Sequence, residues 1–158
     1  MASPATSTHG VVIRGAMATD LEALCNLENQ IFETDRMSRR ALHRLLSSPS
    51  AVVLVAQSDR DIAGVAVILF RAASRIARLY SIGVAPHHTG RGIAKALLAA
   101  AEAAARARHA TTLRLEVHEK NFSAIKLYRG SGYCQFGRHH QYYQDSGHAL
   151  RFEKRLIP

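Results

Sequence analysis

Three polar side chains in the C-terminal half of the sequence have the types and spacing needed for proton transfer. Glu116 alternates with apolar neighbours in an extended pattern, so its carboxylate lies on the face opposite to theirs. Asn121, Ala124 and Tyr128 follow at i, i+3 and i+7, which is one face of a two-turn helix. A carboxylate, an amide and a phenol are thus brought to one cleft, and carboxylates and phenols can accept and donate protons.

Each of these side chains also has a purely structural interpretation. Glu116 could simply pair with an arginine such as Arg114 or Arg78. Asn121 could cap the helix that it precedes, and this role is compatible with binding. Tyr128 could be an ordinary half-buried core aromatic. The common spacing of the three favours the chemical interpretation.

A second motif is a glycine-bearing turn between an expected strand and an expected helix. Gly90 and Gly92 permit positive φ and a close approach of the backbone to a ligand. The first amides of the following helix have no intrahelical acceptor, so the turn suits a pyrophosphate, and Arg91 and Lys95 add positive charge there. The two glycines could equally make only a tight turn, and the sequence contains neither GxxxxGK[ST] nor GxGxxG.

Metal and thiol chemistry are not expected. His87 and His88 are adjacent, so their side chains should point in different directions, and no partner ligand stands at useful spacing. We therefore interpret them as surface histidines and expect no metal. Cys25 and Cys134 lie far apart without metal-ligand spacing, which indicates reduced structural thiols.

The elements that must position these residues follow from the hydrophobic pattern. Asp20 is expected to cap a helix over 21–31, and Ser38 a second helix that ends before Pro49. The remaining pattern predicts strands over 11–14, 51–56, 62–70, 76–84, 112–118, 133–143 and 148–156, and helices over 93–108 and 121–130. This is a mixed α/β order.

The bulk properties fit one globular domain. The chain has 158 residues, 47% of them hydrophobic and 21% charged. Residues 1–10 are polar and are expected to form a flexible tail before a single domain over 11–158. No apolar run is long enough to cross a bilayer, and no export signal is visible, so we expect a cytoplasmic protein without a membrane partner. The net charge of +9 comes from scattered short clusters, which favours a solvated surface over a polyanion site.

Two blocks of the sequence resemble the GNAT acetyltransferases. That family carries [Q/R]-x-x-G-x-[G/A] at a strand-to-helix turn that binds the pyrophosphate of CoA, and residues 89–94 read TGRGIA, with Thr89 in place of Gln or Arg. Residues 115–133 resemble the LEV-x(3)-N-x(2)-A-x(2)-LY-x(3)-G-[FY] block of the subgroup that acetylates protein N-termini. The resemblance covers roughly Ile76 to Leu156. It implies a mixed, mostly antiparallel sheet of six to seven strands that is splayed at the CoA site, with about four helices.

The resemblance also implies roles for individual residues. Glu116 would be the general base through a water molecule, and Tyr128 the acid that protonates the CoA sulfur. Backbone amides near Val84 would polarise the thioester carbonyl, and Asn121 would hold the pantetheine arm. The implied acetyl-CoA site consists of Ile82, Gly83, Val84, Thr89, Gly90, Arg91, Gly92, Ile93, Ala94, Lys95, Asn121, Ala124 and Tyr128. The expected acceptor groove contains Tyr142, Tyr143 and the loop from Phe32 to Arg36.

The expected acceptor is the α-amine of a protein or peptide N-terminus, with a ribosomal protein as one candidate. An α-amine costs about 1.4 kcal/mol to deprotonate near neutral pH, whereas a lysine costs about 4.6 kcal/mol. A small amine or a lysine side chain stays an alternative, as does a non-catalytic module that binds CoA or nucleic acid. We expect no direct nucleic-acid binding, since aromatic-rich strand motifs are missing. The protein is expected to be a monomer or a homodimer.

Overall fold

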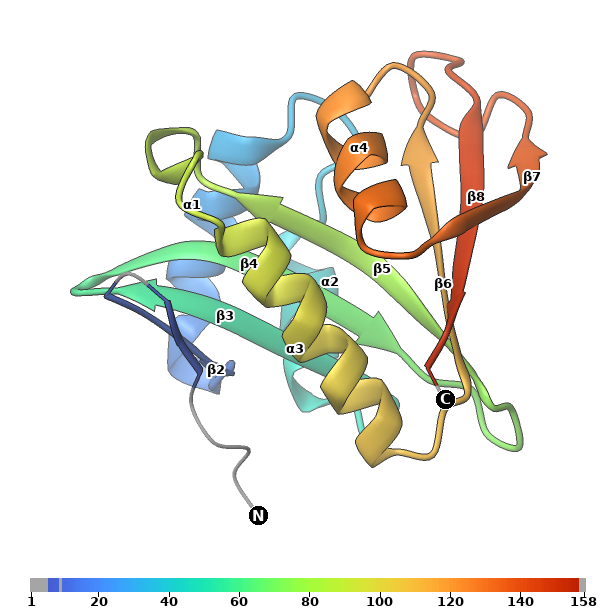
Figure 1. Cartoon of the computed structure of the whole chain (residues 1–158). Helices are drawn as coiled ribbons and strands as arrows, with labels where there is room; N and C mark the ends of the chain where they lie inside the picture. Colours follow the sequence, from blue (N-terminus) through green and yellow to red (C-terminus); the bar gives the residue numbers. More distant parts are fainter. Residues whose placement is uncertain (1–5, 9, 157–158) are drawn as a thin grey trace.

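The computed structural model describes residues 6–8 and 10–156 (Figure 1). The elements in chain order are β1 (Thr6–Thr8), β2 (Val11–Gly15), η1 (Ala18–Asp20), α1 (Leu21–Ile31), α2 (Arg39–Ser47), β3 (Ala51–Ser58), β4 (Asp61–Leu69), β5 (Ile76–Val84), η2 (Pro86–His88), α3 (Ile93–Ala107), β6 (Thr112–His118), α4 (Phe122–Gly130), β7 (Cys134–His139) and β8 (Ala149–Arg155). The strands form one sheet in the order β1-β2-β3-β4-β5-β6-β8-β7. Every neighbouring pair is antiparallel except β5–β6. The expected α/β fold with a mostly antiparallel sheet is confirmed.

The structure differs from the sequence-based expectation at three boundaries. Thr6–Thr8, assigned to the tail, pair with β2, and this short strand brings the described sheet to eight strands; residues 1–5 and 9 lie outside the described part. The two C-terminal strands are shorter than expected because residues 140–148 form a loop, in which Gln141 and Ser146 have positive φ. Asp20 precedes α1 but caps none of its amides, since its carboxylate accepts hydrogen bonds from Arg14 and the Met17 amide.

Different helices cover the two faces of the sheet. In Figure 1, α3 and α4 lie on the near face, and α1 and α2 lie behind β3 and β4. Residues 63–68 of β4 are therefore buried on both sides, and this segment is apolar throughout. Residues of β6 alternate between buried and half-buried, because only one face of that strand meets helices. Within residues 6–8 and 10–156, no helix has the length and apolar character needed to span a membrane.

The parallel pairing of β5 with β6 is short. It runs from Ile76 opposite Thr112 to Leu79 opposite Leu115 and then ends. Tyr80 is an extra residue on β5, since Leu79 and Ser81 pair with successive residues of β4. Beyond Tyr80, β5 stays paired with β4 alone while β6 stays paired with β8. The two central strands therefore separate, as expected from the sequence, and their C-terminal ends border an opening.

The start of α3 packs very closely on the sheet at Gly64. A Cβ at this position would lie 2.9 Å from Leu97 Cδ1, 3.0 Å from the Gly83 carbonyl oxygen and 3.3 Å from Ile93 Cγ2. A glycine on β4 thus allows the first turns of α3 to approach the sheet beside the end of β5. This contact sets the position of the turn that precedes α3.

We expect Gly64→Ala to destabilise the protein by about 1–3 kcal/mol, because the added methyl group overpacks this contact. The free energy of unfolding in urea measures the effect. Gly15→Ala is the matched control on β2, where a Cβ would meet nothing within 4 Å. Equal stability of the two variants would contradict the role given to Gly64.

Candidate functional site

A cavity of about 1120 Å³ opens where β5 and β6 separate. Its walls are the ends of β5 and β6, the turn before α3, the first turns of α4, and the loops that follow α1 and β7. All but one of the residues predicted for the site line it: Phe32, Ile82, Gly83, Val84, Thr89, Gly90, Gly92, Ile93, Ala94, Lys95, Glu116, Asn121, Ala124, Tyr128, Tyr142 and Tyr143. The exception is Arg91.

The turn before α3 has the backbone geometry expected of an anion site. Gly90 and Gly92 have φ of 79° and 75°, and Gly92 occupies the N-cap position of α3. A Cβ at either glycine would meet nothing within 4 Å, so the left-handed backbone, and not crowding, requires glycine here. The first helical hydrogen bond links the Ala96 amide to Gly92. The amides of residues 93–95 consequently lack helical acceptors and stand at the positive end of the helix dipole.

Side chains around this turn differ from the sequence-based expectation. Arg91 is not among the residues that line the cavity; its Nη1 lies 2.6 Å from His88 Nδ1 and 3.4 Å from Ser58 Oγ. Lys95 is therefore the cation of this segment that lines the cavity. The Thr89 hydroxyl, at the family's Gln/Arg position, donates to the Pro86 carbonyl at 2.9 Å and closes the short helix η2.

The expectation that the adjacent histidines point apart is wrong. The rings of His87 and His88 lie 4.3 Å apart, and Asp61 lies close enough for the three to share a metal ion. Burial lowers the pKa of His88, as do the nearby charges of His87 and Arg91. The guanidinium of Arg91 against His88 disfavours a divalent cation at this place.

The end of β5 offers a strand edge to the cavity. Residues 81–84 pair with β4 on one side, and on the other side the described part of the chain provides no strand partner. Gly83 is packed tightly against the end of α1, because a Cβ there would lie 2.9 Å from Ile31 Cγ2 and 3.2 Å from Phe32 Cζ. Backbone groups of Ile82 to Val84 are thus held rigidly at the cavity wall, where they can bind an extended ligand.

Tyr128 combines a core position with a place on the cavity wall. Only 4% of the residue is exposed, and its ring packs against Tyr133 and Phe152 at centroid distances of 5.8 and 6.4 Å. Burial raises the pKa of the Tyr128 phenol well above its usual value. The hydroxyl therefore stays protonated at neutral pH and can serve as a proton donor.

Glu116 lies between two arginines. Its Oε2 accepts a hydrogen bond from Arg78 Nε at 3.0 Å, and its Oε1 lies 3.7 Å from Arg151 Nε. The side chain keeps 12% of its surface exposed, on the cavity side of β6. The pairing with Arg78 considered from the sequence is confirmed, and it fixes the carboxylate at the cavity without removing it from reach.

Asn121 caps α4 and also lines the cavity. Its Oδ1 accepts hydrogen bonds from the Ala124 amide at 3.2 Å and from Ser123 Oγ at 3.3 Å. The capping role considered from the sequence is confirmed. The side-chain nitrogen of Asn121, Nδ2, has no hydrogen bond within the described residues, so it is available to a ligand.

Two loops form a groove at the other end of the cavity. The loop after α1 meets the loop after β7 through two hydrogen bonds. The Asp35 backbone amide donates to Gln144 Oε1 at 3.1 Å, and the Gln144 backbone amide donates to Asp35 Oδ2 at 3.4 Å. Tyr142 and Tyr143 belong to the second loop, and the Tyr142 hydroxyl accepts a bond of 2.5 Å from Arg78. Phe32 lines the groove from the first loop.

His118 positions the second loop. Its Nδ1 accepts from the Lys120 amide at 3.1 Å, so Nε2 carries the proton and donates to Asp145 at 2.9 Å. The ring stacks on Tyr143 with centroids 5.0 Å apart. Gly147 lies against the same ring, because a Cβ there would come within 2.1 Å of His118 Nε2. This clamp, which we define as His118, Asp145 and Gly147, holds Tyr143 over the cavity.

A buried carboxylate, Glu28 on α1, also borders the cavity. Only 2% of the residue is exposed, and burial raises the pKa of its carboxyl. Oε2 accepts from the Met37 amide at 3.0 Å, whereas Oε1 has no partner in the described part of the chain. The bond to Met37 anchors the far end of the loop that carries Phe32.

Four residues that shape the site were not expected from the sequence, namely Glu28, His118, Gln144 and Arg151. A signal existed for His118 alone, since it lies two residues after Glu116 in an alternating strand and must share its face. The others lie on α1, β8 and the last loop, and their sequence distance from Glu116 gives no hint of proximity.

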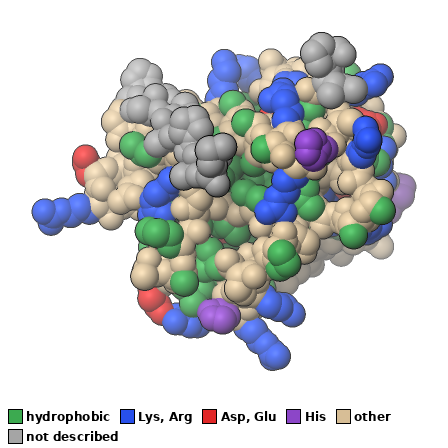
Figure 2. Space-filling model, turned by 90° about the horizontal axis from the view of Figure 1, so that it is seen from below, with side chains coloured by type: hydrophobic (Ala, Val, Ile, Leu, Met, Phe, Trp, Pro, Cys, Tyr) green, Lys and Arg blue, Asp and Glu red, His purple; other side chains and the backbone are tan. Residues whose placement is uncertain are grey.

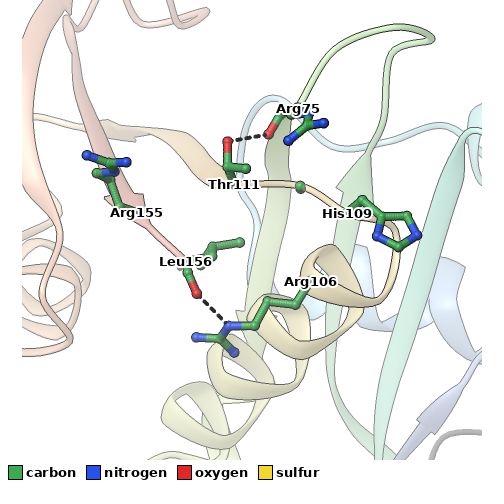
Figure 3. Close-up of a pocket in the computed structure, with 7 residues that line it drawn as sticks. Arg75, Arg106, His109, Thr111, Arg155 and Leu156 are labelled. Atoms are coloured by element: carbon green, nitrogen blue, oxygen red, sulfur yellow. Dashed lines mark hydrogen bonds between the residues drawn. The ribbon is translucent and has the colours of Figure 1, made fainter. Parts of the chain in front are cut away.

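A second hollow, of about 750 Å³, lies near the end of α3 (Figure 3). Arg75, Arg106 and Arg155 surround it, but their side chains spread apart instead of converging on one point. Figure 2 shows Lys and Arg side chains in several separate places on the face that it presents. The scattered charge expected from the sequence agrees with this picture, and the hollow offers no built anion site.

Comparison with known proteins agrees with this geometry. N-alpha-acetyltransferase RimI of Mycobacterium tuberculosis is 33% identical over 148 residues, which cover 89% of both chains. Streptothricin acetyltransferase of Streptomyces lavendulae is 37% identical over 97 residues, 59% of this chain and about half (51%) of that protein. The crystal structure of the ribosomal-protein-S18-alanine N-acetyltransferase from Escherichia coli superposes with a TM-score of 0.84 at 22% identity, covering 94% of this chain and 95% of the other.

The family itself follows from a separate match. Residues 19–133, from within η1 to the residue before β7, match the Acetyltransferase (GNAT) family. This segment contains the glycine turn, the separated strands and the residues Glu116, Asn121 and Tyr128. The chain therefore belongs to the GNAT family of acetyltransferases and is an N-acetyltransferase.

Proposed function

We propose that the protein transfers the acetyl group of acetyl-CoA directly to the α-amine of a protein or peptide N-terminus, in a ternary complex. The observation that carries the proposal is the continuity of one cavity from the α3 turn, past Glu116 and Tyr128, to the groove between the two loops. The similarity to an N-alpha-acetyltransferase over most of the chain supports the same acceptor. A ribosomal protein in the cytoplasm is one candidate.

The residues at the α3 end fit the phosphates of acetyl-CoA. Amides of residues 93–95 and the side chain of Lys95 provide donors and positive charge at a helix N-terminus. Ile82 to Val84 provide a strand edge for the pantetheine arm. Asn121 lines the same cavity and offers its side-chain Nδ2 as a donor. Acetyl-CoA supplies the activated acetyl thioester. Residues of this chain orient it and stabilise the negative charge that develops on its carbonyl oxygen.

Glu116 and Tyr128 carry the proton transfers in this proposal. An attacking amine must lose a proton, and the Glu116 carboxylate accepts it through a water molecule. The departing thiolate must gain a proton, and the Tyr128 phenol, which is protonated at neutral pH, donates it. No covalent acyl-enzyme is needed, so Cys25 and Cys134 take no part.

A small amine is the second candidate acceptor. Streptothricin acetyltransferase, which by its name acts on a small antibiotic, shares 37% identity with this chain over 97 residues. The two candidates are separated by thiol release from acetyl-CoA with a panel of N-terminal peptides, lysine peptides and small amines. Turnover of an N-terminal peptide supports the first candidate, whereas turnover of small amines alone rejects it.

We expect Tyr128→Phe to lower kcat by about a hundredfold or more, because the thiolate loses its proton donor. Binding of CoA, followed by calorimetry, should stay within a few-fold of the native value. Tyr133→Phe is the matched control, since its hydroxyl donates to Glu102 at 2.8 Å and the residue does not line the cavity. A Tyr128→Phe enzyme with native kcat would remove the phenol from the mechanism.

Glu116→Gln should reduce kcat/KM by about ten- to a hundredfold, with the loss largest below the pKa of the acceptor amine, where a base is most needed. A pH series of initial rates measures this. Glu153→Gln is the control, because Glu153 pairs with Arg114 on the same sheet face without lining the cavity. Parallel losses in both variants would indicate a structural effect of broken ion pairs.

Gly147→Ala should raise the KM of the peptide acceptor several-fold and leave the KM of acetyl-CoA unchanged. The new methyl group collides with His118 and displaces the loop that carries Tyr143. Steady-state kinetics with each substrate varied in turn test this. In the control Gly137→Ala, on β7, a Cβ would approach Arg151 no closer than 3.7 Å. An unchanged peptide KM in Gly147→Ala would separate the clamp from acceptor binding.

A further inference from the structure

On the sheet face beside the groove, charged residues of neighbouring strands lie opposite one another. Arg78 on β5 lies opposite Arg114 on β6, and Glu116 on β6 lies opposite Arg151 on β8. Arg114 pairs with Glu153 at 3.4 Å, so these two charges balance. Helices α1 and α2 pack on β3 and β4 instead, which leaves this part of the face partly open.

The positive charge exceeds the negative charge at Glu116. Its single carboxylate lies between the guanidinium groups of Arg78 and Arg151, at 3.0 and 3.7 Å. The other hydrogen-bond partner of Arg78 is a hydroxyl, that of Tyr142, and not a second carboxylate. One positive charge of the trio is therefore uncompensated within the cluster. The two arginines are not themselves among the residues that line the cavity, but both contact Glu116, which lines it.

Donors of the two arginines remain unused. A guanidinium has five N–H donors, and the hydrogen bonds of Arg78 use its Nε and Nη2 only. Arg151 Nε is shielded from solvent and faces Glu116, but the side chain as a whole is 37% exposed and makes no hydrogen bond within the described part of the chain, so its Nη groups are free. Its guanidinium rests on the Phe136 ring at 4.7 Å, which fixes its plane. A planar, positioned guanidinium with free donors is suited to a carboxylate.

We propose that Arg78 and Arg151 form a carboxylate subsite for the acetyl acceptor, adjacent to the place where Glu116 meets the acceptor amine. The proposal rests on the proposed function for the identity of the acceptor as a peptide N-terminus. An acidic side chain at the second or third residue of the peptide then supplies the carboxylate. The α-carboxylate of a free amino acid offers the same group at a similar distance from its amine.

Calorimetry on the CoA-loaded protein tests the subsite. C-terminally amidated peptides that begin Ala-Glu or Ala-Ala-Glu are compared with their Gln counterparts, and alanine with alaninamide. We expect the acidic peptides to bind about tenfold more tightly than the Gln peptides, since charge-assisted hydrogen bonds are lost in the latter. In Arg151→Gln and in Arg78→Gln the ratio should fall to about one. Arg114→Gln, a neighbouring arginine already balanced by Glu153, should keep it.

Each outcome decides a separate point. A preference for acid that disappears in the two variants supports the subsite even where no peptide is acetylated, and in that case only the proposed function fails. A preference confined to alanine over alaninamide assigns the carboxylate to a free amino acid. Equal or undetectable binding of every acid and amide pair, or a preference that survives in both Arg78→Gln and Arg151→Gln, overturns the proposal.

Discussion

The parallel ladder between β5 and β6 ends after Leu79 and Leu115, and the arrangement of the site depends on that early end. The extra residue Tyr80 interrupts the regular pairing of β5 with β4 at the same place. Beyond it, backbone groups of β5 have no neighbour on one side, and unpaired backbone groups at a protein surface readily bind an extended ligand. The same separation leaves Glu116 at the end of β6, facing the opening.

Close packing then brings the glycine turn before α3 to this opening. Gly64 lets α3 approach the sheet, and the buried Glu102 of α3 accepts hydrogen bonds from Tyr133 and from Lys154 on β8 at 2.8 and 2.9 Å. These contacts join α3 to the strands on the far side of the opening. Tyr128 packs against Tyr133 and Phe152 within the same core, so the candidate acid shares the rigidity of the core.

The groove between the loops after α1 and β7 is held together by a different kind of contact. Its two loops meet through exposed polar contacts, such as Asp35 with Gln144 and His118 with Asp145. Exposed polar pairs contribute little free energy each, so this half of the site can open at small cost while the cofactor half stays fixed. Under the proposed function, that division suits an enzyme that binds one constant donor molecule and an acceptor of variable sequence.

Much of the fold was predictable because it depends on local pattern. Apolar alternation placed β6, a continuous apolar run placed β4, and the cap at Ser38 placed the start of α2, where its Oγ accepts from the Ala41 amide at 3.1 Å. The ends of the last two strands were placed poorly, because the loop between them is stabilised by contacts with distant residues such as Asp35.

The sequence by itself determined the glycine turn, the helix that follows it, and the alternation that exposes Glu116, because each depends on backbone preferences of neighbouring residues. Only the tertiary structure decided that Arg91 contacts His88 and Ser58, that Glu116 lies between Arg78 and Arg151, and that His118 holds the last loop. Each of these arrangements includes a contact between residues 27 to 38 positions apart. Such contacts follow from strand order and register, which no local pattern encodes.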